Sequence, residues 1–381
     1  MNIKGFFAIA FILYLLLLLQ TNYIRIDAQQ KGFQIVETGN TVEIACMEMG
    51  LEKFKAIINK NGGISEIQIS GVPYTGAAGT FIWNLWDQTS NSNPIASPVI
   101  ENKGEYVEAR FYGKYRDSEI YVNTNYTIFK TGLIFISSVL EARRDEPTVM
   151  QTAWMIYFPT SIFVNEKAYV RFENEVREIA LPVEVTRGSF YEGRDIVYWV
   201  DFSKPTEGIT FINMAPGSED WYGTTVRDER QWGFVQGYCA FFAHTSYGGG
   251  AMAMGDKRIS KVALYIHGPG GYEGNREVLD LISDFAKTDV KCSKALKSYS
   301  TNTNAWKLAS QAKENINSGL ERLARGDIDG SKANLEDAKK LLEEIEKASG
   351  IGFETLLFPV IILILIIIVV TIIIRRRKPK K

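Results

Sequence analysis

Residues 120–129 read Ile120-Tyr121-Val122-Asn123-Thr124-Asn125-Tyr126-Thr127-Ile128-Phe129 and carry the strongest β-strand signal in the chain. Side chains alternate between the two faces of a strand, so the even-numbered residues point one way and the odd-numbered ones the other. One face can therefore be buried against a second sheet. Lys130-Thr131-Gly132 then turns the chain into a second apolar run at 133–140. The pair predicts an antiparallel hairpin.

The same pattern extends over residues 29–290, which are rich in Tyr, Phe, Ile, Val and Thr, with Gly, Asn, Asp and Pro between the short runs. Such punctuation is typical of antiparallel strands. Asn61-Gly62 separates two apolar runs and predicts a type I′ hairpin turn, which needs positive φ at both residues. Further strands are expected at 168–172, 196–202, 208–214, 233–244 and 261–267.

A strand-rich region of this length without regularly alternating helices favours one large antiparallel sandwich over a parallel α/β sheet. An array of small domains is the alternative, although no internal repeat is visible. Within the region, 275–287 has helical spacing and Asn275 as a candidate cap, which predicts a helix that closes the sandwich.

Residues 294–348 change to a helical period and predict an α-helical hairpin. Ala309 and Ile316 belong to one apolar face, and Leu335 and Leu342 to another. Gly326 suits the left-handed end of the first helix, and Asp327 suits the cap of the second. A spacer near the membrane or a docking surface is the expected role.

The carboxyl-terminal segment 353–374 is almost unbroken Ile, Leu and Val, and 375–381 is basic. About 20 apolar residues span a bilayer as a helix, and flanking basic residues stay on the cytoplasmic side. The segment predicts a single-pass transmembrane helix that contacts the lipid bilayer, with a short cytoplasmic tail. The rest of the protein is expected outside the cytoplasm, at the cell membrane.

The amino-terminal segment 1–28 agrees with this orientation. Lys4 precedes an apolar run, 5–19, with the length of a secretory signal. Ala28 could end a cleaved signal peptide, but Ile26 occupies a position where a small residue is preferred. An uncleaved signal anchor is therefore the alternative, and both place the body outside.

Composition excludes several classes of function. The formal net charge of −1 gives no basic face for nucleic acid.

Cys46, Cys239 and Cys292 allow one disulfide and a spare thiol, with three pairings open, but form no CxxC motif, so no metal is expected. The glycine-rich 268–274 has the wrong spacing for a dinucleotide loop, and no cofactor is expected. Asn125-Tyr126-Thr127 is a glycosylation sequon.

The hairpin segment reads Ile57-Ile58-Asn59-Lys60-Asn61-Gly62-Gly63-Ile64-Ser65-Glu66-Ile67-Gln68-Ile69-Ser70-Gly71-Val72-Pro73-Tyr74. It resembles the opening hairpin of galactose-mutarotase-like domains. The resemblance implies a large antiparallel β-supersandwich whose concave face holds a saccharide. Epimerases of that family use a His acid and a Glu base. Their flanking motifs do not align with this chain, so no catalytic residue is carried over.

Candidate catalytic residues are few. The chain has only two histidines, His244 and His267, each at the end of an expected strand beside a glycine-containing loop. A histidine there can act as a general acid or base, and Glu229 is the carboxylate candidate for the same role. The alternative for the histidines is a hydrogen-bonded surface or edge residue.

Carbohydrate recognition favours aromatic rings beside charged planar groups, because rings cover the C–H faces of a sugar and guanidinium or carboxylate groups bind its hydroxyls. The segments 219–222 and 227–232 are densest in this mixture, and a solvated loop with salt bridges is the alternative. Trp83 and Trp86 offer a second stacking platform or core packing. The candidate carbohydrate-binding residues are Trp221, Tyr222, Arg227, Asp228, Arg230, Trp232, Trp83 and Trp86.

The sequence as a whole favours a membrane-anchored cell-surface protein that binds carbohydrate or an envelope glycan. Two alternatives stay open. The first is a structural or adaptor protein that binds envelope proteins through the sandwich and the helical hairpin. The second is a polysaccharide lyase or glycoside hydrolase that uses His244, His267 or Glu229.

Overall fold

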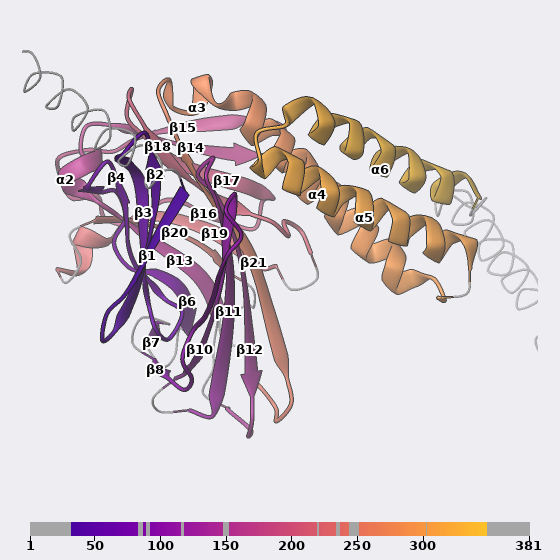
Figure 1. Cartoon of the computed structure of the whole chain (residues 1–381), viewed down its shortest axis with the longest axis horizontal. Helices are drawn as coiled ribbons and strands as arrows, with labels where there is room; N and C mark the ends of the chain where they lie inside the picture. The colour runs from indigo at the N-terminus through magenta and orange to yellow at the C-terminus, as the bar shows by residue number, and fades with distance from the viewer. Residues whose placement is uncertain are drawn as a thin grey trace, which may run out of the picture. The chain divides into compact units, whose positions relative to one another are not determined.

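The structure is a computed structural model that describes residues 32–82, 87–88, 92–115, 118–147, 152–218, 221–233, 237–243, 251–301 and 303–348. The chain forms two compact units. The first contains Met1–Ala286 and Ala324–Gly326, and the second contains Lys287–Leu323 and Asp327–Lys381. The first is built mainly from two large antiparallel sheets and the second from helices (Figure 1).

Sheet A has eleven strands in the order β1-β2-β3-β4-β6-β13-β20-β19-β16, with β5 paired to β4 and β7 to β6. Its strands are β1 (Gly32–Glu37), β2 (Thr41–Glu48), β3 (Leu51–Asn59), β4 (Ile64–Ile69), β5 (Val72–Pro73), β6 (Ala78–Ile82), β7 (Asp87–Gln88), β13 (Thr152–Pro159), β16 (Ser189–Gly193), β19 (Gly223–Asp228) and β20 (Gly237–Ala243).

Sheet B has ten strands in the order β15-β14-β17-β18-β21-β12-β11-β10-β8, with β9 paired to β10. Its strands are β8 (Asn93–Pro94), β9 (Val99–Asn102), β10 (Tyr106–Lys114), β11 (Ile120–Phe129), β12 (Leu133–Ala142), β14 (Lys167–Phe172), β15 (Val176–Ala180), β17 (Val197–Ser203), β18 (Gly208–Asn213) and β21 (Lys257–His267).

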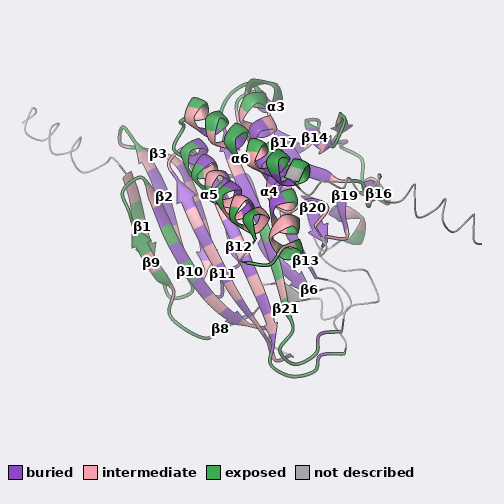
Figure 2. Cartoon of the chain, turned by 90° about the vertical axis from the view of Figure 1, so that its right-hand side faces the viewer, coloured by how far each residue is buried: buried purple, intermediate pink, exposed green. Residues whose placement is uncertain are grey.

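The expected hairpin of β11 and β12 is confirmed. The even-numbered residues of β11 are buried and the odd-numbered ones are half-buried, except Phe129 at its end. The same alternation continues across β10 and β12 (Figure 2). Tyr126 lies opposite Ala109 on one side and Ile136 on the other, and all three belong to the core between the sheets.

The core is held by large aromatic side chains from both sheets. Phe158 of sheet A stacks on Phe202 of sheet B with ring centroids 3.9 Å apart. The ring centroids of Trp154 in sheet A and Phe211 in sheet B are 5.8 Å apart. Side chains of this size dominate core energetics because each buries a large apolar area. The two sheets therefore form the predicted sandwich.

The turn between β3 and β4 differs from the predicted type I′ turn. Gly62 has a φ of 95°, but Asn61 is not among the residues with positive φ. The reason is that the Asn61 side chain closes the turn itself: its Oδ1 accepts a hydrogen bond from Gly63 N, and its Nδ2 donates to Ser92 O. Tyr126 then donates to the Gly62 carbonyl at 2.6 Å, which fixes the turn against sheet B.

The long helices follow the last strand in sequence, whereas two short helical turns lie between strands. Short helical turns are α2 (Thr160–Phe163), η2 (Glu229–Trp232) and α3 (Gly271–Gly274). The helix expected at 275–287 is α4 (Arg276–Ser298), longer than predicted because buried residues recur through Cys292. The Asn275 side chain does not cap α4 as predicted. Its Oδ1 accepts from Tyr265 and its Nδ2 donates to the Gly271 carbonyl.

The expected helical hairpin is formed by α5 (Asn304–Ala324) and α6 (Ile328–Ala348), which belong to the second unit except for Ala324. Gly326 has the predicted left-handed conformation, with φ at 86°, and Asp327 Oδ1 accepts from Gly330 N at 2.9 Å. Ser331 of α6 donates to the Gly319 carbonyl of α5 at 2.8 Å. The predicted apolar faces, which include Ala309 and Leu335, are buried.

The cysteines form no disulfide: Cys46, Cys239 and Cys292 are all free and buried. Four strands of sheet A separate β2, which holds Cys46, from β20, which holds Cys239. Neighbouring strands lie about 4.8 Å apart, so these two sulfurs are far beyond bonding distance.

In the described ranges no helix is long and apolar enough to cross a membrane. The expected signal segment 1–28, the expected membrane helix 353–374 and the basic tail 375–381 lie outside those ranges.

Candidate functional site

The outer face of sheet A is apolar where β13 and β20 pair. On the core side β20 presents Tyr238, Ala240 and Phe242, and on the outer side it presents Cys239, Phe241 and Ala243. Tyr157 and Tyr222 pack against this outer cluster. A strand that is buried on both faces has a continuous apolar sequence instead of alternating polar and apolar residues. The outer face is therefore a second packing surface.

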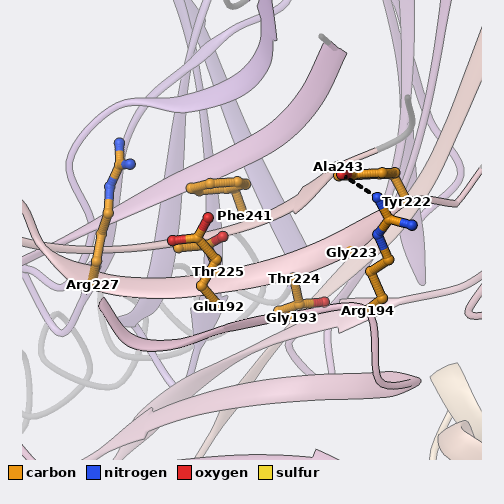
Figure 3. Close-up of a pocket in the computed structure, with 10 residues that line it drawn as sticks. All are labelled: Glu192, Gly193, Arg194, Tyr222, Gly223, Thr224, Thr225, Arg227, Phe241 and Ala243. Carbon is orange, nitrogen blue, oxygen red and sulfur yellow. Dashed lines mark hydrogen bonds between the residues drawn. The ribbon is translucent and has the colours of Figure 1, made fainter. Parts of the chain in front are cut away.

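A cavity of about 510 Å³ opens on this outer face, at the end of sheet A formed by β16, β19 and β20 (Figure 3). The register of β19 explains which side chains line it. Val226 belongs to the core between the sheets, so Thr225 and Arg227 on either side of it face the cavity. The lining residues are Glu192, Gly193, Arg194, Tyr222, Gly223, Thr224, Thr225, Arg227, Phe241 and Ala243.

Arg227 forms one end of the cavity. Its Nε donates to Oε1 of Glu229, and this ion pair is largely desolvated because Glu229 is only 1% exposed. The Arg227 guanidinium also lies over the Phe241 ring, 5.3 Å from its centroid. A planar guanidinium held by a carboxylate and a ring has a fixed orientation, which lets it bind an incoming hydroxyl with little further loss of entropy.

Arg194 and Tyr222 form the other end (Figure 3). Arg194 Nη2 donates to the Tyr222 hydroxyl at 2.6 Å, and its guanidinium lies 4.4 Å from the centroid of that ring. Tyr222 is fixed in turn by its backbone N–H, which donates to the Ala243 carbonyl at 2.9 Å. Phe241 and Glu192 lie between the two ends. Oε2 of Glu192 accepts from Ser189 at 3.0 Å.

The charges of the site balance. Two guanidinium groups, Arg194 and Arg227, are matched by the carboxylates of Glu192 and Glu229. A cavity lined by one sign of charge would attract an ion of the opposite sign. This cavity instead offers hydrogen-bond donors and acceptors around an aromatic ring, which suits a neutral, polyhydroxylated ligand.

The predicted carbohydrate-binding residues are thus partly brought together: Tyr222 and Arg227 both line the cavity. Asp228 and Arg230 do not. Asp228 is fully buried and accepts hydrogen bonds from Arg230 Nη2 and from Thr186 N. Burial alone would raise the pKa of Asp228, but these hydrogen bonds and the Arg230 charge outweigh it and lower the pKa.

Arg230 serves as a tether. Its guanidinium donates to the carbonyls of Pro182, Val183 and Glu184 as well as to Asp228. One side chain therefore fixes the loop that follows β15 against η2.

The predicted tryptophans have different environments. Trp221 is half-buried and Trp232 is 57% exposed at the end of η2, and neither lines the cavity. Trp83 and Trp86 lie outside the described residues.

The predicted acid–base residues are not grouped around the cavity. His267 has a fully inaccessible side chain in sheet B, where its Nε2 lies 2.8 Å from Asp201 Oδ1. His267 is hydrogen-bonded, as the alternative expected, but it is buried in an inner strand and is neither a surface nor an edge residue. Glu229 is not among the residues that line the cavity and forms an ion pair with Arg227, and His244 lies outside the described residues. Among the residues that the structure describes, no group of three or more His, Cys, Asp or Glu could hold a metal ion.

Sequence reasoning did not identify Glu192, Arg194 and Phe241 as site residues. The only sequence signal at the first two is Glu192-Gly193-Arg194-Asp195, a charged turn that resembles any solvated loop. Phe241 lies in an apolar run, which reads as core.

No protein-family model and no curated protein matches this chain. The solved structures that it resembles include a galactose 1-epimerase from Lactobacillus acidophilus, at 7% identity and a TM-score of 0.41, covering 62% of this chain and 98% of that one. An α-mannosidase from Enterococcus faecalis matches at 14% identity and a TM-score of 0.41, covering 67% of this chain and 32% of that one.

A heparan sulfate lyase from Pedobacter heparinus matches at 9% identity and a TM-score of 0.33, covering 63% of this chain and 36% of that one. The weak resemblance to galactose-mutarotase-like structures that the 57–74 hairpin indicated is confirmed.

Proposed function

We propose that this protein binds a neutral carbohydrate in the cavity of β16, β19 and β20, and that it does so at the cell surface, held in the membrane by 353–374. The observation that carries the proposal is the placement of two guanidinium groups at the ends of the cavity: Arg227, paired with Glu229, lies over the Phe241 ring, and Arg194 contacts the hydroxyl and ring of Tyr222. Sugar hydroxyls would accept hydrogen bonds from Arg194 and Arg227 and donate to Glu192, while the Phe241 ring would cover an apolar C–H face.

Binding rather than cleavage is proposed because the cavity lacks a pair of acid and base groups in its described lining. Glycoside hydrolysis uses two carboxyl groups about 5 to 10 Å apart, one of them protonated. Among the described lining residues Glu192 is the one carboxylate, and Glu229 is tied to Arg227. Product release from a polysaccharide that disappears in Glu229→Gln would instead favour a lyase or hydrolase.

The adaptor alternative is favoured by a different surface. Trp232 is 57% exposed, Val183 is 57% exposed and Val185 is 49% exposed. Arg230 joins the two segments that carry them, since η2 holds Arg230 and the 182–184 carbonyls accept its hydrogen bonds. Exposed apolar groups on a rigid support are typical of protein-binding surfaces.

The direct test of saccharide binding is a glycan array probed with the full-length protein in detergent micelles. We expect saturable binding to a neutral glycan that falls at least about tenfold, or ~1.4 kcal/mol, in Arg227→Ala and Tyr222→Ala. Arg177→Ala is the matched control. The Arg177 guanidinium also lies over a ring, 4.5 Å from the centroid of Phe172, but Arg177 belongs to β15 of sheet B, away from the strands that form the cavity. Silence across all glycans would contradict the proposal and favour the adaptor.

Anchoring is tested separately. Protease added to intact cells should digest the sandwich and spare an epitope tag placed after residue 381. Loss of the tag with an intact sandwich would reverse the proposed orientation.

A further inference from the structure

The outer face of sheet B contains a second feature that saccharide binding does not use. Asn125-Tyr126-Thr127 is the only Asn-x-Ser/Thr sequence among the 381 residues. It lies in the middle of β11, where Tyr126 is buried in the core and its two neighbours face outward. A strand places residues i and i+2 on the same face, so Asn125 and Thr127 are presented side by side.

The contacts of Asn125 fix the orientation of its amide. Arg110 of β10 lies directly opposite, and its Nε donates to Asn125 Oδ1 at 3.0 Å. Because a guanidinium only donates, the atom that it contacts must be the amide oxygen. The Nδ2 atom is therefore on the side of the amide away from Arg110. The residue opposite on β12 is Ser137, one of the smallest side chains.

The surroundings have room for an attached sugar. A hollow of about 200 Å³ adjoins Asn125 on this face, lined by residues that include Val99, Glu101, Glu108, Arg110 and Thr127. Glu101, Glu108 and Arg110 are exposed. Carboxylate and guanidinium groups around the attachment atom would hold the hydroxyls of a first sugar without disturbing the buried face of the strand.

From this geometry we propose that Asn125 is an N-glycosylation site and that the mature protein has one N-linked glycan on β11. The inference rests on the proposed location outside the cytoplasm, where glycans are transferred to sequons. The co-reactant is a lipid-linked glycosyl phosphate, used by a separate transferase. The bond from sugar C1 to the phosphate oxygen breaks, and the phosphate leaves with the electron pair. The new bond joins C1 to Nδ2, and one amide proton passes to a base of the transferase.

The site is separate from the saccharide-binding cavity. Asn125 belongs to sheet B, whereas the cavity is formed by strands of sheet A. A glycan on Asn125 is part of the protein's surface, not its ligand. The two proposals share the exterior location, but saccharide binding and glycan attachment are measured at different sites and can be told apart.

The test is mass spectrometry of the full-length protein, extracted in detergent from a host whose other exterior proteins carry N-glycans. Trypsin should release residues 117–130 as one peptide that contains the sequon. We expect this peptide to have the added mass of a glycan, localised to Asn125 by fragmentation. The modification should be lost in Asn125→Gln and Thr127→Ala and kept in Thr127→Ser.

Asn123→Gln is the matched control, since Asn123 faces outward from the same strand but is followed two residues later by Asn125 instead of a hydroxyl residue. It should keep the glycan. An unmodified 117–130 peptide alongside glycosylated peptides from other exterior proteins of the same extract would overturn the proposal. Asn125→Gln should lose the added mass but still bind the array glycan. Mass spectrometry therefore tests the glycosylation of Asn125, and the array separately tests saccharide binding.

Discussion

His267 Nε2 lies 2.8 Å from Asp201 Oδ1 inside sheet B, with both side chains fully inaccessible to solvent. Asn275 Nδ2 lies 3.1 Å from the other ring nitrogen, and an amide nitrogen only donates. The same ring nitrogen lies 3.3 Å from the Gly268 carbonyl, and Nε2 is placed to donate to the Asp201 carboxylate. Ser203 and Thr210 each donate a further hydrogen bond to the same carboxylate at 2.7 Å. This network ties β17, β18 and β21 together.

His267→Ala should destabilise the protein strongly, because it leaves the Asp201 carboxylate buried without its nitrogen donor. Removing one partner of a buried pair costs on the order of 3 kcal/mol. The measurement is urea denaturation followed by tryptophan fluorescence. Thr210→Val removes one of the two hydroxyl donors and should cost only about 1 kcal/mol.

The same variant distinguishes structure from catalysis. His267→Ala that remains folded should bind saccharide like the wild type. A folded variant with unchanged stability but abolished turnover of a polysaccharide would instead make His267 a catalytic residue.

Arg230→Lys should loosen the loop at 182–184, because a single ammonium group cannot reach three carbonyls and the Asp228 carboxylate together. The expected loss of stability is roughly 2 kcal/mol, since hydrogen bonds to charged groups contribute about 1.5–3 kcal/mol each. Limited proteolysis should gain a cleavage site in this loop. Arg177→Lys is the control, because Arg177 makes a surface ion pair with Glu175 and a ring contact with Phe172, and the change should cost less than about 1 kcal/mol. If Arg230→Lys and Arg177→Lys lost the same stability and showed the same cleavage pattern, Arg230 would not be the residue that fixes the loop at 182–184.

The buried thiols predict how stability changes at alkaline pH. Burial raises the pKa of Cys46 from 9.0 to about 11. In the unfolded chain the thiol ionises near pH 9, while in the folded protein it stays protonated, so the unfolded state binds fewer protons and stability falls as pH rises from 9 to 11. Cys46→Ala should reduce the slope of the free energy of unfolding against pH in this window. If Cys46→Ala had the same slope as the wild type, burial would not raise the pKa of the Cys46 thiol in the folded protein.

The fold could be predicted from the sequence where one pattern dominates. Ile120–Phe129 alternates without interruption, and its predicted bounds are those of β11. Strands such as β19 could not be predicted as readily. Its Gly-Thr-Thr-Val-Arg-Asp mixes polar and apolar residues because one face packs in the core and the other lines a cavity.

The site was predictable only in part for a related reason. Tyr222 and Arg227 belong to two neighbouring short segments, 219–222 and 227–232, whose composition stands out. Arg194 and Phe241 come from segments before and after these, and only the pairing of β16 with β19 and of β19 with β20 brings them together. Local composition contains no information on such pairings. The length of α4 was missed because the apolar spacing beyond 287 weakens before Cys292.

Hydrogen–deuterium exchange with a saturating amount of the array-selected glycan shows whether a saccharide occupies the cavity of β16, β19 and β20. We expect slower exchange of the backbone amides at 192–194 and 222–227, with β10 and β11 unchanged. Protection confined to any other surface, or no protection at saturation, would contradict saccharide binding in this cavity.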